Sequence, residues 1–311
     1  MKFLIAGGAG FIGANLCKLL LDEGNEVIVY DNLSTGRWDN LEPFSSNKNL
    51  TFELQDVKNL KISSNLKLDG IFNLASPASP SSYQSKPIET LMTNVLGAFN
   101  LLSIASRKNI RIVQASTSEV YGDPLVSPQI ESYWGNVNPV GPRSCYDEGK
   151  RAAEALFFDF QREEKTDIRV ARIFNTYGPL MAPNDGRVVS NFIVQALNNS
   201  PITIYGTGSQ TRSFCFVDDL VIGLKQLMNE PGIQGPINLG NTQTLSIIEL
   251  AKLVVSIADS KSKLVFKPSP VDDPKVRVPD LTLARNLLNF NPTVSISEGL
   301  FKTIEYFKKK L

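Results

Sequence analysis

Three glycines at regular spacing, Gly7, Gly10 and Gly13, constrain the fold of this chain more than any other feature. They follow a short apolar run at 2–6 and precede a stretch of helical character at 14–21. Glycines at such a junction let backbone N–H groups and a helix N-terminus approach a pyrophosphate, because no side chain stands between them. The motif therefore predicts a strand, a dinucleotide-binding turn and a helix.

A carboxylate ends the second apolar run, at Asp31. A carboxylate in that place accepts from the 2′-hydroxyl of NAD and repels the extra phosphate of NADP, so NAD is the expected cofactor. Arg37 lies six residues further on and is able to hold a 2′-phosphate, which leaves NADP open. Asp56 follows the third strand and is expected either to reach the adenine or to cap the strand end. The expected cofactor residues are Gly7, Gly10, Phe11, Ile12, Gly13, Asp31, Asn32, Thr35, Gly36, Asp56, Val57, Leu74, Ala75, Tyr146 and Lys150.

Strand-like and helical stretches alternate through the first half of the chain. Apolar runs lie at 50–54, 70–74 and 111–115, and helical stretches lie at 88–107 and 148–164. This alternation predicts an α/β fold with a Rossmann-type doubly wound parallel sheet.

The alternation ends after a strand at 168–172, where the chain becomes rich in Pro, Gly and Asn. We therefore assign residues 1–174 to an NAD-binding Rossmann domain. Residues 175–311 are assigned mainly to a smaller α/β lobe that binds a nucleotide sugar, with a possible return to the sheet near 236–240. In this part we expect a strand at 202–205 and helices at 188–197, 218–229, 247–258 and 296–309.

Composition excludes several classes of function. The 311 residues include no histidine, which rules out Ser-His-Asp hydrolysis and the commonest transition-metal sites, and no metal is expected. The chain has 32 Lys and Arg against 31 Asp and Glu. It has no basic segment of the kind that binds a nucleic-acid backbone. The chain starts without an apolar leader, so we expect neither export nor membrane insertion. Three widely spaced cysteines suit reduced thiols and a cytoplasmic location.

A phenol and an ammonium, Tyr146 and Lys150, lie on one face of a helix that begins near Cys145. Tyrosine is a poor base near neutrality, but an adjacent fixed cation favours the phenolate, which then takes a proton from a hydroxyl. Lys150 is also placed to bind the nicotinamide ribose. Thr117 follows the strand at 111–115, at the sheet edge where ligands bind, and we expect it to contact the same hydroxyl.

The chain resembles the extended short-chain dehydrogenase/reductase family over essentially its whole length. The likeness rests on the glycine motif, on the Thr117, Tyr146 and Lys150 set, and on Arg172-x-Phe-Asn-Thr-Tyr-Gly-Pro179. Within the family it is most similar to members that decarboxylate UDP-glucuronate, through the segments 73–80, 115–124, 144–151, 184–192 and 206–214.

The resemblance implies that Thr117, Tyr146 and Lys150 serve oxidation at carbon 4 of the sugar, with hydride passing to NAD. A ketone at carbon 4 makes the carbon-6 carboxylate of UDP-glucuronate a β-keto acid, so carbon dioxide leaves. The hydride held on the cofactor then reduces the ketone, which gives UDP-xylose without net redox change.

Three alternatives remain. In related nucleotide-sugar 4,6-dehydratases an Asp stands where this chain has Ser118, which is a poor proton donor at neutral pH, whereas loss of carbon dioxide needs no acid for the leaving group. A 4-epimerase has no need of the carboxylate of Glu119. A non-catalytic NAD-binding scaffold is disfavoured by the intact Thr117, Tyr146 and Lys150 set.

The remaining site residues have more than one possible role. Glu119 is expected to repel the substrate carboxylate, to act through water or to organise its neighbours, and Ser118 to orient that carboxylate or cap a turn. Arg212 and Arg277 are candidates for the diphosphate, with surface salt bridges as the alternative. Further substrate contacts are expected at Tyr83, Asn175, Arg187, Asn191 and Tyr205. The resemblance also implies a homodimer, in which the helices near 88–107 and 148–164 form a four-helix interface.

Overall fold

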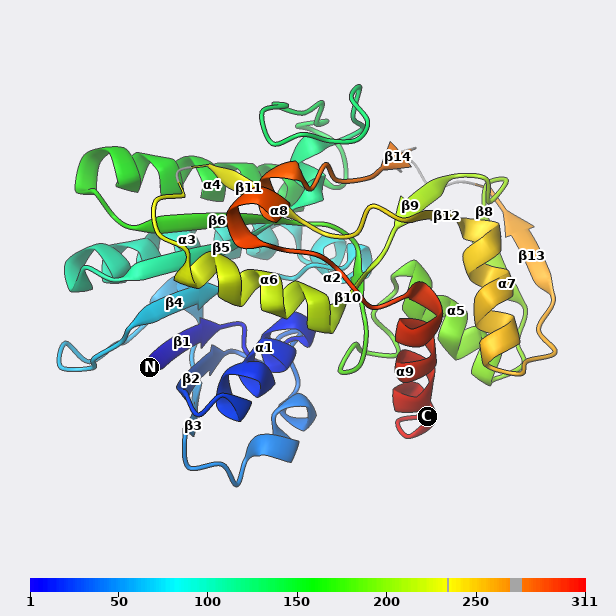
Figure 1. Cartoon of the computed structure of the whole chain (residues 1–311), viewed down its shortest axis with the longest axis horizontal. Coiled ribbons are helices and arrows are strands. Elements are labelled where there is room, and N and C mark those ends of the chain that lie inside the picture. Colours follow the sequence, from blue (N-terminus) through cyan, green and yellow to red (C-terminus); the bar gives the residue numbers. More distant parts are fainter. Residues whose placement is uncertain (234, 269–275) are drawn as a thin grey trace.

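A parallel sheet of seven strands forms the middle layer of the larger part of the molecule, at the left in Figure 1. The computed structural model describes residues 1–233, 235–268 and 276–311. The strand order β11-β6-β5-β4-β1-β2-β3 places the first strand inside the sheet, with neighbours that wind outward in both directions. The doubly wound parallel sheet predicted from the sequence is confirmed. Its strands are β1 (Lys2–Ala6), β2 (Glu26–Asp31), β3 (Leu50–Leu54), β4 (Gly70–Asn73), β5 (Arg111–Thr117), β6 (Ile168–Ile173) and β11 (Pro236–Leu239).

Helices cover both faces of the sheet, which is why its inner strands read as nearly continuous apolar runs. Successive side chains of a strand point to opposite faces. Phe3 and Ile5 of β1 pack in a core with helices α1 (Phe11–Asp22), α6 (Val217–Asn229) and α8 (Thr282–Leu288). Leu4 and Ala6 pack in a second core, on the opposite face, with α3 (Pro87–Lys108) and α4 (Ser144–Glu164).

A smaller lobe lies to the right of the sheet in Figure 1. Its core is built from α5 (Val188–Leu197), α7 (Ile247–Ile257) and α9 (Ile296–Lys308) around β8 (Ile202–Tyr205), which pairs with β13 (Leu264–Lys267). Two small sheets join this lobe to the first domain. They pair β7 (Thr176–Tyr177) with β10 (Cys215–Phe216), and β9 (Thr211–Ser213) with both β12 (Thr244–Ser246) and β14 (Val276–Arg277).

The second part of the chain also returns to the first domain. β11 adds to the sheet beside β6, with Pro236 opposite Val170 and Leu239 opposite Ile173. Helices α6 and α8 pack in the same core as α1. Residues after 174 therefore supply part of the sheet and of one helical layer as well as the lobe.

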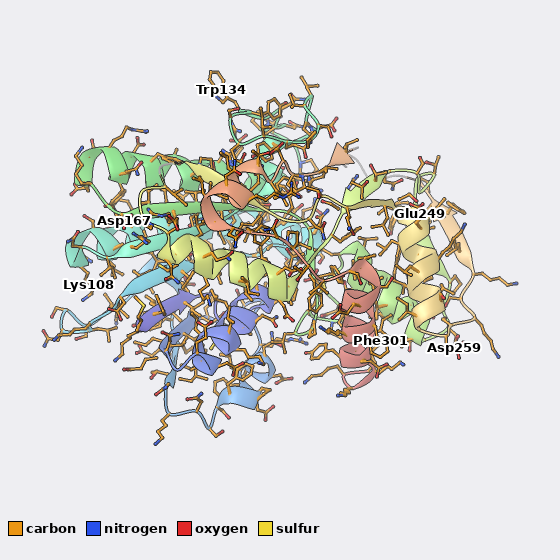
Figure 2. All side chains as sticks on the ribbon, viewed as in Figure 1. Lys108, Trp134, Asp167, Glu249, Asp259 and Phe301 are labelled. Atoms are coloured by element: carbon orange, nitrogen blue, oxygen red, sulfur yellow. The ribbon has the colours of Figure 1, made fainter. Side chains whose placement is uncertain are left out.

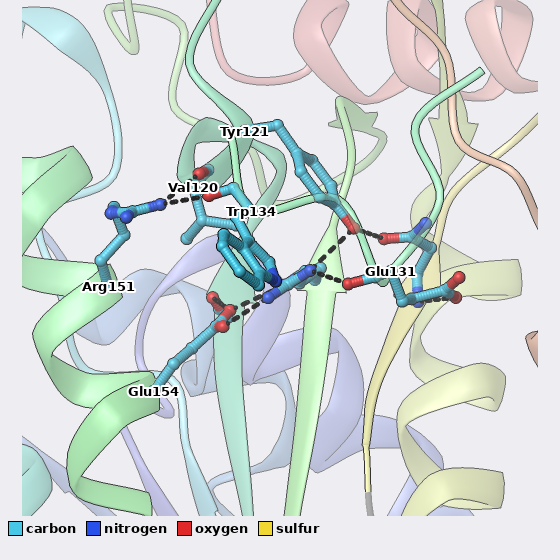
Figure 3. A network of polar contacts seen from close by, with 9 residues as sticks. Val120, Tyr121, Glu131, Trp134, Arg151 and Glu154 are labelled. Carbon is cyan, nitrogen blue, oxygen red and sulfur yellow. Dashed lines mark hydrogen bonds and ion pairs between the residues drawn. The ribbon is translucent and has the colours of Figure 1, made fainter. Parts of the chain in front are cut away.

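A buried polar network fixes the segment that follows β5 (Figure 3). Arg172 of β6 makes a two-point ion pair with Glu154 of α4, with Nη2–Oε2 at 2.8 Å and Nε–Oε1 at 3.1 Å. Its Nη1 donates to the hydroxyl of Tyr121 at 3.0 Å and to the carbonyl of Glu131 at 2.8 Å. The hydroxyl of Tyr121 donates in turn to Asn238 of β11 at 2.8 Å. Charged groups inside a protein are retained when they are paired and hydrogen-bonded in this way.

The loop between β5 and α4 is tied down from α4. Arg151 donates to the carbonyls of Val120 and Trp134 at 3.0 and 2.7 Å. The indole of Trp134 itself points outward at the tip of this loop and is 89% exposed (Figure 2). The backbone of the loop is therefore ordered by α4 even where its side chains face solvent.

Candidate active site

The turn between β1 and α1 is shaped by the close approach of backbone segments. Gly7 has a φ of +78°, and a Cβ on it would lie 2.7 Å from the backbone N of Ala75. A Cβ on Gly13 would lie 2.3 Å from the carbonyl oxygen of Gly7. Helix α1 begins at Phe11 with Gly10 as its N-cap and has no side-chain cap, so its first N–H groups are open to an anion. The residues of this turn fit a pyrophosphate.

Asp31, at the end of β2, is buried and faces this turn. Its carboxylate accepts from the N–H of Ala9 at 3.0 Å and from the N–H of Leu33 at 2.8 Å. Burial raises the pKa of Asp31, and the two N–H donors oppose that shift because they stabilise the charged form. A Cβ on Gly36 would lie 2.8 Å from both carboxylate oxygens, so glycine there keeps the carboxylate accessible.

A pocket extends from the glycine turn along the carboxyl ends of β2 and β4. It brings together most of the cofactor residues expected from the sequence. The lining residues that were not expected are Tyr30, Ser34, Gln55, Ser76, Pro77, Glu89 and Thr93. Phe11, Ile12 and Gly13 form the first turn of the adjoining helix α1. The expected residues that line the pocket are Gly7, Gly10, Asp31, Asn32, Thr35, Gly36, Val57, Leu74 and Ala75.

Asp56 is used differently. Its Oδ1 accepts from the N–H of Lys58 at 2.9 Å and so caps the short helix η3 (Val57–Asn59), and its Oδ2 accepts from Asn32 at 3.0 Å. Asp56 therefore caps the helix that follows β3, and its contact with the adenine stays a prediction. The guanidinium of Arg37 donates to Asn40 at 3.5 Å.

The catalytic residues expected from the sequence meet where β5 ends and α4 begins. Thr117 is the last residue of β5, and Tyr146 lies in the first turn of α4, where the side chain of Thr117 helps to lower the pKa of its phenol. One turn further along α4, the Nζ of Lys150 donates to the carbonyl of Ala115 at 2.8 Å and lies 5.7 Å from the centre of the Tyr146 ring. The spacing read from the sequence thus places both side chains on the face of α4 that covers β5.

The electrostatics of this pair differ from what the spacing implied. Burial raises the pKa of Tyr146 to about 12, and the interaction with the Thr117 side chain only partly opposes that shift. Burial also lowers the pKa of Lys150 to about 7, against the weaker opposing charge of Glu154. The phenolate is therefore not favoured by the protein alone, because desolvation disfavours both charged forms.

Tyr83 of α2 (Pro80–Ser85) packs flat on Tyr146. The rings of Tyr83 and Tyr146 are stacked, with centroids 5.0 Å apart and planes 7° from parallel. Tyr83 is 1% exposed, and its hydroxyl has no hydrogen-bond partner among the described residues. The stack fixes the plane of the Tyr146 ring.

Glu119 follows Thr117 in the short helix η4 (Ser118–Tyr121) and lies between two arginines. Arg277 of β14 contacts both of its oxygens, with Nη2–Oε2 at 2.8 Å. Arg143, the N-cap of α4, places Nη2 at 2.6 Å from the same Oε2. Although burial opposes ionisation, the two guanidinium groups lower the pKa of Glu119 to about 2. Glu119 is therefore a fixed carboxylate, beside the buried Ser118.

Arg143 and Asp147 were not expected from the sequence. Asp147 lies one helical turn after Arg143, with 3.9 Å between Oδ2 and the arginine Nε. Burial and the nearby charge of Glu119 raise the pKa of Asp147 to about 7. The i, i+4 spacing of these two charged residues around Tyr146 was the available signal, since such pairs share a helix face.

Apart from Tyr83, the residues expected to hold the substrate come from the lobe and its connections. Arg212 and Arg277 are opposite each other on the neighbouring strands β9 and β14, and both are buried. Arg187 pairs with Asp185 at 2.5 Å, and its positive charge reaches Tyr146. The remaining three residues are Asn175, Asn191 and Tyr205. The carbonyl of Asn175 accepts from the N–H of Cys215, and the side-chain amide of Asn191 donates to the carbonyl of Gly186. Tyr205 is the last residue of β8 and is 45% exposed.

The fold and the site together define a dinucleotide-binding enzyme, in which Thr117, Tyr146 and Lys150 lie together where β5 ends and α4 begins. The chain belongs to the NAD dependent epimerase/dehydratase family, which it matches over residues 3–240. It is 50% identical over 310 residues to UDP-glucuronic acid decarboxylase 1 of Danio rerio. The aligned region is 100% of this chain and 73% of that relative.

Two solved structures share the whole fold. UDP-glucose 4-epimerase of Thermotoga maritima, solved with UDP-glucose, has a TM-score of 0.92 and 31% identity, and covers 100% of this chain and 99% of its own. UDP-glucuronic acid 4-epimerase of Bacillus cereus, solved with UDP-glucuronic acid and NAD, has a TM-score of 0.90 and 28% identity and covers 100% of both chains. The cofactor of this chain is NAD, as its family and its open glycine turn require.

The glycine turn gives a direct test of the cofactor site. Gly13→Ala is expected to weaken NAD binding at least about tenfold, because its methyl group collides with backbone that cannot move without reshaping the turn. Gly235→Ala, where a Cβ meets open space, is the matched control and keeps wild-type affinity. Binding is measured by calorimetry on protein whose circular dichroism is unchanged, and equal affinity of the two variants would contradict the assignment.

Proposed function

We propose that this chain converts UDP-glucuronate to UDP-xylose and carbon dioxide. The observation that carries the proposal is the 50% identity to a UDP-glucuronic acid decarboxylase over the whole chain, together with an ionised Glu119 beside Thr117 and Tyr146. The chemistry supplied by NAD is the acceptance of hydride from carbon 4 of the sugar and its later return.

The protein residues supply the proton transfer at carbon 4. The phenolate of Tyr146 takes the proton of the hydroxyl as the carbon is oxidised and becomes the phenol, while Thr117, whose side chain interacts with Tyr146, orders the two oxygens. Lys150 is anchored on the carbonyl of Ala115 and keeps its amine next to the Tyr146 ring. Since burial holds the pKa of Tyr146 at about 12 in the protein alone, positive charge brought by the ligands is needed to form the phenolate.

The loss of carbon dioxide follows from the position of the ketone. The bond between carbons 5 and 6 breaks, its electron pair moves to the oxygen at carbon 4, and a proton replaces the carboxylate at carbon 5. The protonated Tyr146 donates a hydrogen bond to the enolate oxygen that develops. Glu119 adds a fixed negative charge to the site, which favours departure of the substrate carboxylate by repulsion.

The same electrostatics disfavour a dehydratase. Expulsion of a hydroxyl from carbon 6 needs an acid that gives a proton to the leaving group. Glu119 is held ionised by two guanidinium groups and carries no proton near neutral pH. Ser118, which precedes Glu119, carries only a hydroxyl group, and this is a poor proton donor at neutral pH. Neither side chain is suited to that step.

A 4-epimerase is the second candidate, because the Bacillus cereus structure binds the same class of substrate in the same fold. Both reactions begin with oxidation at carbon 4. They differ in the fate of the carboxylate, which an epimerase retains in its product.

Purified protein with NAD and UDP-glucuronate is expected to release UDP-xylose and carbon dioxide. Tyr146→Phe is expected to lower kcat about 100- to 10,000-fold, since it removes the proton acceptor. Tyr133→Phe, which alters a tyrosine outside the site, is the control with wild-type rate. Products are identified by chromatography and mass spectrometry. The carbon-4 epimer of the substrate as sole product supports the epimerase, and a 4-keto-6-deoxy product from UDP-glucose supports the dehydratase.

We further propose a homodimer built on α3 and α4. Helix α3 is long and apolar enough to cross a membrane by length and composition alone, but a core helix passes the same test. One face of α3 packs on the sheet and on α4. Beside that face α3 carries exposed apolar side chains at helical spacing, of which Phe99 also contacts Phe160 of α4: Ile88, Leu91, Met92, Leu96 and Phe99. A stripe of this kind on a monomer marks an interaction surface, and a second copy of the α3 and α4 pair covers it.

Phe99→Glu is expected to convert the dimer to a monomer at micromolar concentration, because it places a charge in the proposed interface. Phe301→Glu, at a similarly exposed position of α9, is the control that stays dimeric (Figure 2). Molar mass is measured by light scattering. A monomeric wild type would contradict the proposal, and co-flotation of the wild type with lipid vesicles would assign the stripe to a membrane.

A cytoplasmic location is proposed from the cysteines. Cys17, Cys145 and Cys215 are free and buried, which suits a reducing compartment.

A further inference from the structure

Glu119 is held from two different parts of the fold. Arg277 belongs to β14, in the small sheet that connects the lobe to the first domain. Arg143 belongs to the first domain, at the start of the helix that carries Tyr146. Of the two arginines, only Arg143 belongs to the same domain as Tyr146 and Thr117.

Arg143 organises its surroundings through both its backbone and its side chain. Its carbonyl accepts from the N–H of Tyr146 at 3.0 Å and from the N–H of Asp147 at 3.1 Å, and so begins the first turn of α4. Its Nη2 contacts Glu119 at 2.6 Å, and the side chain is 16% exposed. A single residue thus links the carboxylate of η4 to the turn that presents the catalytic phenol.

Arg277 has a competing use. It lies opposite Arg212 on adjacent strands, and two buried guanidinium groups side by side suit the two phosphates of a nucleotide sugar. Arginine binds phosphate in the same two-point manner as it binds a carboxylate, so an entering diphosphate competes with Glu119 for Arg277. Without a second cation, Glu119 would then be a buried and unpaired charge.

We propose that Arg143 is a positioning residue, which holds the Glu119 carboxylate beside Tyr146 while Arg277 turns to the substrate diphosphate. The inference rests on the proposed function for the identity of the substrate. It assigns the two arginines separate tasks: Arg143 is the constant partner of Glu119, and Arg277 is the exchangeable one.

The charge of Glu119 depends on a small set of neighbours. Two cations stabilise its ionised form, and a carboxyl and two phenols face it from α4 and α2. These groups are Arg143, Arg277, Asp147, Tyr146 and Tyr83. Loss of Arg143 removes one of the two cations, so the pKa of Glu119 rises, and it rises further when a phosphate takes Arg277. Glu119 has a depressed pKa in the folded protein, and its charge is lost as pH falls through that value.

The first test compares pH profiles for UDP-glucuronate turnover. Arg143→Met is expected to lower kcat at least about tenfold with less than about a threefold change in KM, and to move the acid limb of kcat to higher pH by at least about one unit. Arg143→Lys restores part of the rate and part of the shift, since it keeps a cation but not the guanidinium fork. In a Glu119→Gln background, Arg143→Met is expected to cause almost no further loss of kcat.

The matched control is Arg151→Met. Arg151 also lies on α4 and holds η4, through the carbonyl of Val120, but it pairs with Glu148 and not with Glu119. This variant is expected to lower thermal stability without moving the acid limb. The proposal is overturned if Arg143→Met leaves the acid limb in place, or if its loss of kcat multiplies with that of Glu119→Gln.

The second test needs no turnover. The carboxyl resonance of Glu119 is followed in NAD-loaded protein labelled with ¹³C in glutamate, assigned by its absence in Glu119→Gln, with UDP as the probe. In the wild type no titration is expected above about pH 4, with or without UDP. In Arg143→Met a titration appears above that pH and moves higher when UDP is added.

An Arg143→Met resonance that does not titrate above about pH 4 with UDP bound would overturn the proposal. Because UDP replaces the substrate, this result stands even if the wild type does not decarboxylate UDP-glucuronate. A failure of the proposed function is seen separately, as a wild type without UDP-xylose product.

Discussion

The hydrogen bond from the ammonium of Lys150 to the carbonyl of Ala115 holds the active site together. It joins the helix that carries Tyr146 to the strand that ends in Thr117, inside a layer where Lys150 is only 3% exposed. Burial lowers the pKa of Lys150 to about 7, so its charge is sensitive to the groups that bind next to it. This contact sets the register between α4 and β5. The position of Glu119 relative to α4 and the position of Tyr146 under the ring of Tyr83 both depend on that register.

The site separates two kinds of charge. The phenol and the amine are disfavoured as ions because they are buried without strong partners, whereas Glu119 is kept ionised by two guanidinium groups. A protein arranged in this way activates its phenol only when ligands complete the site, and it keeps Glu119 as a carboxylate that has no proton to give. That combination suits the removal of a carboxylate better than the protonation of a leaving hydroxyl.

Local sequence patterns predicted the parts of the molecule that local rules govern. The glycine turn, Asp31 at the end of β2 and the spacing of Tyr146 and Lys150 each follow from a strand end or a helix turn. Glu119 and Arg277 are 158 positions apart in the sequence. Arg277 lies on β14, a strand of two residues, which is too short to give a periodic signal. The raised pKa of Tyr146 could also not be predicted from the sequence, because it depends on burial that the whole fold creates.

The central claim is that carbon 4 of UDP-glucuronate is oxidised and then reduced within one binding event. The most direct measurement uses UDP-glucuronate that carries deuterium at carbon 4, in ordinary water, with the UDP-xylose product analysed by NMR and mass spectrometry. The account predicts that the product retains the deuterium at carbon 4, because the hydride is removed and returned without exchange. UDP-xylose with hydrogen from the solvent at carbon 4 would contradict it.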